Sequence, residues 1–192
     1  MAEKKYVCVY CASSKEVGCI YFDAAERLAA LLAGSGYGLV CGGGNEGLMN
    51  SVADSALAAG GEVVGIIPAF MKEKGWMHRG LTQSIVTPDI HTRKRQMASL
   101  SDAVVALPGG CGTMEELLEI ITWKQLRLYD GLIVVLNVGG FYNPLLEMLH
   151  RAVDQHFMKS SHRSLWQVAD TPEQAINLIA TFRPERVEPK RP

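Results

Sequence analysis

Three short turns rich in small residues carry the groups that could bind an anion. They are Cys11-Ala-Ser-Ser14, Gly42-Gly-Gly-Asn-Glu-Gly47 and Pro108-Gly-Gly-Cys-Gly-Thr113, and each follows an apolar, strand-like segment. The third is the most informative, because three glycines in four positions exceed what a simple turn requires. It leads into a helix whose free N–H groups and dipole favour a negative charge, phosphate above all. We predict a phosphate site there, with the Thr113 hydroxyl capping the helix.

This turn matches neither of the two common glycine-rich nucleotide motifs. No Gly-Lys-Ser/Thr follows it, so it is not a P-loop, and its spacing is not that of the GxGxxG dinucleotide fingerprint. The prediction is therefore an anion site at a helix start. The other two turns are open between a ligand role, through groups such as Ser13 and Gly43, and simple packing.

Glu116 lies three residues after Thr113, one turn into the predicted helix and on the side of the glycine turn. A carboxylate in that place can stabilise a sugar that develops positive charge. Glu115 and Glu116 can equally do no more than complement the positive N-terminus of the helix. The spacing alone leaves both interpretations open.

The segment His91-Thr-Arg-Lys-Arg-Gln-Met97 places three cations in one turn of a predicted helix. Composition alone favours a solvated basic face. This helix nevertheless leads into the strand that ends at Pro108, so its N-terminal end can lie on the ligand side. There Arg93 can offer a planar fork to phosphate or sugar oxygens.

Strands and helices alternate along the chain, and several strands are continuous apolar runs, which is typical of strands covered on both faces. We therefore predict a Rossmann-like α/β fold, doubly wound around a mainly parallel sheet of about seven strands. Ligands in such folds lie beyond the carboxyl ends of the strands. We expect one domain at 1–182 and a flexible tail at 183–192. Strands are predicted at 6–10, 38–41, 62–67, 84–87, 103–107, 132–137 and 166–168, helices at 21–33, 47–59, 91–100, 113–126, 142–157 and 172–182, and a less regular stretch at 69–83.

Composition argues against several classes of protein. The formal net charge of -1 over 192 residues gives no basic excess for a nucleic-acid polymer. No apolar run approaches the roughly 18 residues that cross a bilayer, and no signal-peptide pattern is present, so we expect no membrane partner and a cytoplasmic location. The five cysteines are odd in number and indicate reduced thiols. Cys8 and Cys11 form a CxxC, but on a strand they point to opposite faces, and we predict no metal site.

Taken together, these segments resemble the LOG family of cytokinin riboside 5'-monophosphate phosphoribohydrolases, long mislabelled as lysine decarboxylases. The family pattern PGGxGTxxE is intact from Pro108 to Glu116, and the upstream Arg-Lys-x-x-Met segment is Arg93-Lys-Arg-Gln-Met97. The pattern GGGxxGLMG matches residues 42–50 except at its last position, Asn50. The resemblance covers roughly residues 6–158.

The resemblance implies hydrolysis of the N-glycosidic bond of an adenosine 5'-monophosphate, usually N6-modified, giving the free base and ribose 5-phosphate. It implies no metal or organic cofactor, a homodimer or larger assembly, and a reaction through an oxocarbenium-like sugar. It makes Arg93 and Glu116 the catalytic pair. The expected substrate-binding residues are Ser13, Gly43, Arg93, Lys94, Met97, Gly109, Gly110, Cys111, Gly112, Thr113, Met114, Glu115 and Glu116.

The chain departs from the family pattern at three places. Asn50 and Ala12 each replace a glycine, and Gly75 stands where many relatives carry a substrate-contacting glutamate, with Glu73 close by. The main alternative is a non-catalytic carrier of a nucleotide or of the molybdenum cofactor, and retention of both Arg93 and Glu116 argues against it. A lysine decarboxylase is a poor third reading, since nothing indicates a pyridoxal phosphate site.

Overall fold

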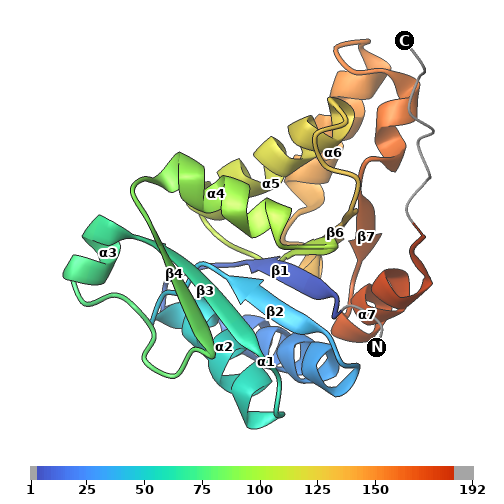
Figure 1. Cartoon of the computed structure of the whole chain (residues 1–192). Helices are drawn as coiled ribbons and strands as arrows, with labels where there is room; N and C mark the ends of the chain where they lie inside the picture. Colours follow the sequence, from blue (N-terminus) through green and yellow to red (C-terminus); the bar gives the residue numbers. More distant parts are fainter. Residues whose placement is uncertain (1–3, 184–192) are drawn as a thin grey trace.

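The computed structural model describes residues 4–183 and contains one seven-stranded sheet, in which every neighbouring pair of strands runs parallel (Figure 1). The spatial order is β4-β3-β2-β1-β5-β6-β7. The predicted parallel, doubly wound α/β fold is confirmed. The strands are β1 (Tyr6–Tyr10), β2 (Gly38–Cys41), β3 (Val63–Pro68), β4 (Gln83–Thr87), β5 (Ala103–Ala106), β6 (Leu132–Leu136) and β7 (Gln167–Ala169).

Helices cover both faces of the sheet (Figure 1). On one face lie α1 (Cys19–Gly34), α2 (Gly47–Ala58) and α7 (Pro172–Thr181), and on the other α4 (Ile90–Ser99), α5 (Cys111–Gln125) and α6 (Asn143–Asp154). A short α3 (Ala69–Glu73) follows β3.

The strands form because their side chains are buried on both faces. In β6 all five residues, Leu-Ile-Val-Val-Leu, are buried, and full burial of such a side chain contributes about 1.5–3 kcal/mol. Side chains of β1 alternate between the two layers: Val7 and Val9 join the core under α1, α2 and α7, whereas Cys8 and Tyr10 join the core under α4, α5 and α6. Cys8 and Cys11 therefore lie in different cores, as the strand geometry predicts.

The direction in which successive strands are added to the sheet changes at the boundary between β1 and β5. Strands β1 to β4 are laid down outward in one direction, and β5 to β7 outward in the other. The loops after β1 and β5 consequently diverge at the carboxyl edge, which opens a crevice in folds of this kind. This topology sets the place of the site described below.

Several details differ from the sequence-based expectations. Helix α1 begins at Cys19, two residues before its predicted start, and α6 ends at Asp154, three residues before its predicted end. The stretch at 69–83, expected to be irregular, contains α3, whose five residues are too few to show helical periodicity. Helix α5 begins at Cys111, two residues before the predicted start. The division into a domain at 1–182 and a tail stays a prediction, because residues 184–192 lie outside the described part. Within residues 4–183, no helix is both long enough and apolar enough to span a membrane.

Candidate active site

A cavity of about 370 Å³ opens at the switch point between β1 and β5. It falls within the range of roughly 300–1,000 Å³ usual for small-molecule sites. Its wall comes from the turn after β1, the turn after β2, helix α4 and the start of α5. The lining residues are Val9, Tyr10, Cys11, Ala12, Ser13, Ser14, Gly42, Met49, Arg93, Met97, Gly110, Cys111, Gly112, Thr113 and Glu116.

The start of α5 presents free N–H groups to this cavity. Gly110 is the N-cap residue, and the N–H of Met114 is the first to bond within the helix, to the Gly110 oxygen at 3.0 Å. The N–H groups of Cys111, Gly112 and Thr113 have no acceptor in the helix, and together with the helix dipole they favour an anion. A Cβ at Gly110 or Gly112 would meet no atom within 4 Å, so these two positions leave the approach open.

Thr113 does not cap the helix, and that prediction is wrong. It lies inside α5, and no side chain caps the helix start. Its hydroxyl instead occupies the space beside Gly109, where an added Cβ would lie 2.1 Å from Thr113 Oγ1. Glycine at 109 is therefore required by the packing of Thr113, which is buried while lining the cavity.

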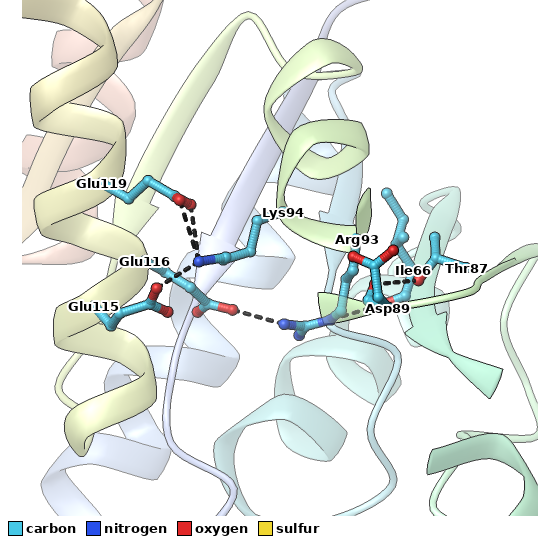
Figure 2. A network of polar contacts seen from close by, with 8 residues as sticks. All are labelled: Ile66, Thr87, Asp89, Arg93, Lys94, Glu115, Glu116 and Glu119. Atoms are coloured by element: carbon cyan, nitrogen blue, oxygen red, sulfur yellow. Dashed lines mark hydrogen bonds and ion pairs between the residues drawn. The ribbon is translucent and has the colours of Figure 1, made fainter. Parts of the chain in front are cut away.

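Arg93 and Glu116 face each other across the cavity wall (Figure 2). Arg93 Nη1 donates to Glu116 Oε1 at 2.7 Å, and each side chain is only 11% exposed. Burial raises the pKa of the Glu116 carboxyl above its usual value, and the Arg93 guanidinium opposes that rise. The sequence left open whether Glu116 serves the helix dipole or the ligand; its buried carboxylate on the cavity wall favours the ligand.

The orientation of Arg93 is fixed by its own helix and by two neighbouring strands. Asp89 caps α4, accepting the Thr92 N–H at 2.7 Å, and this bond keeps the pKa of Asp89 below its usual value. Arg93 lies in the first turn of that helix, and its Nε donates to the carbonyl of Ile66 in β3 at 2.9 Å (Figure 2). A Cβ at Gly42, directly after β2, would lie 2.1 Å from Arg93 Nη2. The glycine therefore leaves room for the guanidinium.

The first two turns, at residues 11–14 and 42–47, pack tightly on each other. Gly47 has φ +57°, and a Cβ there would lie 2.4 Å from the carbonyl oxygen of Ser14. Gly43 has φ +69° and packs on the backbone of Gly65 in β3, away from the cavity lining. Of this pair of turns, the first supplies Ser13 and Ser14 to the cavity, and the second supplies Gly42.

Asn50, which replaces the last glycine of the family pattern, has a defined partner. Its side-chain amide donates to Asp54 at 2.7 Å, and Asp54 also contacts His78 Nε2 at 2.9 Å. The His78 ring is buried, and its backbone N–H donates to the carbonyl of Gly43 at 2.9 Å. This set of contacts docks the loop after α3 onto the turn behind Arg93.

The structure brings most of the predicted site residues to one cavity and separates others from it. Ser13, Arg93, Met97, Glu116 and the turn 110–113 line it, whereas Gly43, Lys94, Gly109, Met114 and Glu115 do not. The cavity is also lined by Val9, Tyr10 and Met49, which were not predicted as site residues, and by Gly42 of the turn whose ligand role was left open. Their positions at strand ends and at the start of α2 were the available signal. Across residues 4–183, no group of three or more histidine, cysteine, aspartate or glutamate side chains could hold a metal ion.

The basic segment of α4 is not a solvated face. Arg93 is directed into the cavity wall, and Lys94 is buried against α5, so that only Arg95 of the three cations is exposed. The interpretation favoured by composition alone is wrong. Composition could not reveal the acidic partners, which lie more than twenty residues later in the chain.

The family model and the curated relatives that match this chain point to the same family. A family model described as possible lysine decarboxylase matches residues 49–179. The chain is 42% identical over 180 residues to the cytokinin riboside 5'-monophosphate phosphoribohydrolase LOG5 of Arabidopsis thaliana, covering 94% of this chain and 79% of that protein. It is 39% identical over 186 residues to LOG3 of the same plant, covering 96% and 86%.

Solved structures show the same fold at lower identity. The molybdenum cofactor carrier protein of Chlamydomonas reinhardtii superposes with a TM-score of 0.71 at 22% identity, covering 93% of this chain and 97% of that one. The molybdenum cofactor binding protein of Rippkaea orientalis gives 0.70 at 22% identity, covering 94% and 98%. At this identity the likeness supports the fold alone. The matching family model and the relatives of about 40% identity show that the chain belongs to the LOG family, the cytokinin riboside 5'-monophosphate phosphoribohydrolases.

Proposed function

We propose that the protein hydrolyses the N-glycosidic bond of adenosine 5'-monophosphates, including N6-modified ones, to the free base and ribose 5-phosphate. The observation that carries this proposal is the pairing, on one cavity, of the free N–H groups of α5 with the buried Arg93–Glu116 pair. The first feature fits a phosphate and the second fits a sugar that develops positive charge. The activity named for the relatives agrees with it.

In the proposed reaction the nucleotide phosphate lies at the N–H groups of Cys111, Gly112 and Thr113. Binding this remote group orients the ribose at the reacting carbon. The Glu116 carboxylate stabilises the oxocarbenium-like ribose and orients or deprotonates the attacking water. The guanidinium of Arg93 holds Glu116 in its ionised form and in place, and its remaining donors face substrate oxygens.

We propose direct substrate contacts for the predicted residues that line the cavity. These are Ser13, Arg93, Met97, Gly110, Cys111, Gly112, Thr113 and Glu116. Lys94, Gly43, Gly109, Met114 and Glu115 are then supporting residues, because they lie outside the lining.

A panel of nucleoside 5'-monophosphates, assayed for free base by chromatography, tests the reaction. We expect base and ribose 5-phosphate from AMP and its N6-modified forms, and a loss of more than a hundredfold in kcat for Glu116→Ala and Arg93→Ala. A carrier of nucleotide or molybdenum cofactor is the competing outcome: it would bind AMP in calorimetry and release no base. Full activity in a folded Glu116→Ala protein would remove Glu116 from the mechanism.

We further propose a homodimer that uses the outer face of α5. A shallow hollow there is lined by the apolar side chains of Met114, Leu118 and Trp123 together with Cys111, Glu115, Glu119 and Thr122, and Leu118 is 40% exposed. An exposed apolar surface of this kind is typical of a protein contact. Sedimentation of the wild type and of Leu118→Glu tests it. We expect the wild type to be a dimer and Leu118→Glu to be a monomer, and a monomeric wild type would refute the proposal.

A cytoplasmic location is also proposed, supported by the five free cysteines.

A further inference from the structure

Lys94 is a buried cation at the crossing of α4 and α5. Its side chain is 4% exposed, and its Nζ contacts Glu115 and, at 3.1 Å, Glu119 Oε2 (Figure 2). A buried lysine remains charged only if carboxylates replace the water it has lost. Burial here opposes the charged form, but the two glutamates prevail and raise the pKa of Lys94. The ammonium group is therefore fully engaged within the protein.

The neighbouring cations Arg93 and Lys94 on α4 form ion pairs with different carboxylates on α5. Glu115 and Glu119 are four residues apart and share one face of α5, where they meet Lys94. Glu116, one residue on, is turned toward the cavity and meets Arg93. Arg93 lines the cavity and Lys94 does not. The Lys94 ammonium group is therefore directed at the two glutamates and not at the cavity.

We propose that Lys94 is a positioning residue: it holds the first turns of α5 against α4 through Glu115 and Glu119, and thereby sets the place of Glu116 without touching the nucleotide. The inference rests on the proposed function of this cavity. It assigns to Lys94 a role other than the substrate contact that the family pattern implied.

The charged groups around Glu116 act in opposite directions. Burial raises the pKa of the Glu116 carboxyl, Arg93 lowers it, Glu115 raises it and Lys94 lowers it. The cysteine and tyrosine side chains near Glu116 are neutral, because burial raises the pKa of each. They are Cys8, Tyr10 and Cys11 from β1 and its turn, and Tyr142 at the start of α6.

Removal of Lys94 and removal of the Glu115 charge therefore change the pKa of Glu116 in opposite directions. Without Lys94, a lowering influence is lost and Glu115 is no longer neutralised, so the pKa of Glu116 rises. Without the charge of Glu115, a raising influence is lost and the pKa of Glu116 falls. If ionised Glu116 is the active form, the acid limb of the pH–rate profile must move to higher pH in Lys94→Met and to lower pH in Glu115→Gln.

The experiment measures kcat, KM for AMP and the inhibition constant of ribose 5-phosphate across pH. For Lys94→Met we expect kcat to fall by about 10- to 100-fold. We expect KM for AMP and the inhibition constant of ribose 5-phosphate to change less than threefold, and the acid limb of the pH–rate profile to move to higher pH. Lys94→Arg should recover part of kcat. Glu115 is 57% exposed, so Glu115→Gln folds without difficulty and should move the acid limb down. Lys5→Met, at an exposed lysine, is the matched control.

Two outcomes overturn the proposal. One is a Lys94→Met protein whose kcat is intact while KM and the ribose 5-phosphate constant rise tenfold or more, as a direct phosphate contact requires. The other is an acid limb that moves in the same direction, or not at all, in Lys94→Met and Glu115→Gln. A wild type that releases no base fails the proposed function instead. The titration of Glu116, followed by carboxyl-labelled NMR in the same variants, then tests the positioning role alone.

Discussion

Substitution of Gly42 by alanine is expected to disable the site while leaving the fold in place. Gly42 follows β2 and lies against the guanidinium of Arg93. An added Cβ would lie 2.1 Å from Arg93 Nη2 and 2.9 Å from Met49 Sδ. Both are ends of flexible side chains, so the side chains give way and the backbone does not.

The magnitude follows from the distances. Ordinary contact requires a separation of about 3.5 Å, so Nη2 must retreat by about 1.4 Å. A movement of that size is large enough to break the 2.7 Å contact between Arg93 Nη1 and Glu116 Oε1. Misplacement by about 1 Å costs on the order of a hundredfold in rate, or about 2.7 kcal/mol of transition-state free energy. Crowding in a packed region lowers the free energy of unfolding by about 1–3 kcal/mol.

The assay is release of adenine from AMP, with thermal unfolding measured on the same preparation. Gly34→Ala is the matched control, because a Cβ at the last residue of α1 meets nothing within 4 Å. We expect the control to match the wild type and Gly42→Ala to lose about a hundredfold in kcat/KM. A folded Gly42→Ala protein within threefold of wild-type kcat/KM would refute the reasoning, because it would show that the placement of Arg93 does not limit the reaction.

Four further predictions follow from the same contacts. The midpoint of the acid limb of the kcat/KM profile should lie above pH 4.5, the usual pKa of a glutamate carboxyl, because the pKa of Glu116 is raised and activity is lost as the pH drops through it. A midpoint below pH 4.5 in a pH titration would contradict this. Gly110→Ala adds a methyl group on the open side of the anion site, so KM for AMP should rise about tenfold with unchanged Tm. His78→Ala should lower the free energy of unfolding by about 1–3 kcal/mol in urea titration, since it removes a buried ring and leaves the Gly80 N–H without its acceptor. Leu117→Ala, at a fully buried core position, should lower it by about 2–5 kcal/mol, and a loss below 1 kcal/mol would contradict the packing.

The sheet could be predicted from the sequence because its signal is local. Continuous apolar runs such as residues 132–136 indicate strands covered on both faces, and the alternation with helices indicates parallel pairing. The glycine-rich turn at 108–113 and the helix that follows it were equally visible, since they adjoin in the chain.

The roles of individual side chains could not be predicted in this way, because they depend on contacts between distant segments. Lys94 meets Glu119, 25 residues later, only when α4 and α5 are packed on the sheet. Thr113 looked like a helix cap, but Gly110 has the extended backbone of the N-cap position, and Thr113 falls inside the first turn. The pattern of neighbouring residues in the sequence shows neither the contact of Lys94 with Glu119 nor the place of Thr113 inside α5.

The cap at Asp89 sets the rotational phase of α4. Each residue turns a helix by about 100°, so the interval from Asp89 to Arg93 decides which cation faces the cavity and which faces α5. Insertion of one residue in that interval would turn Thr92 toward the cavity and Arg93 toward α5, and deletion of one residue would turn Lys94 toward the cavity and Arg95 toward α5. Substitution at a single position cannot restore both partnerships at once. The first turn of α4 should therefore accept replacement of residues other than Asp89, Arg93 and Lys94 but no change of length, and homologous sequences should show that asymmetry.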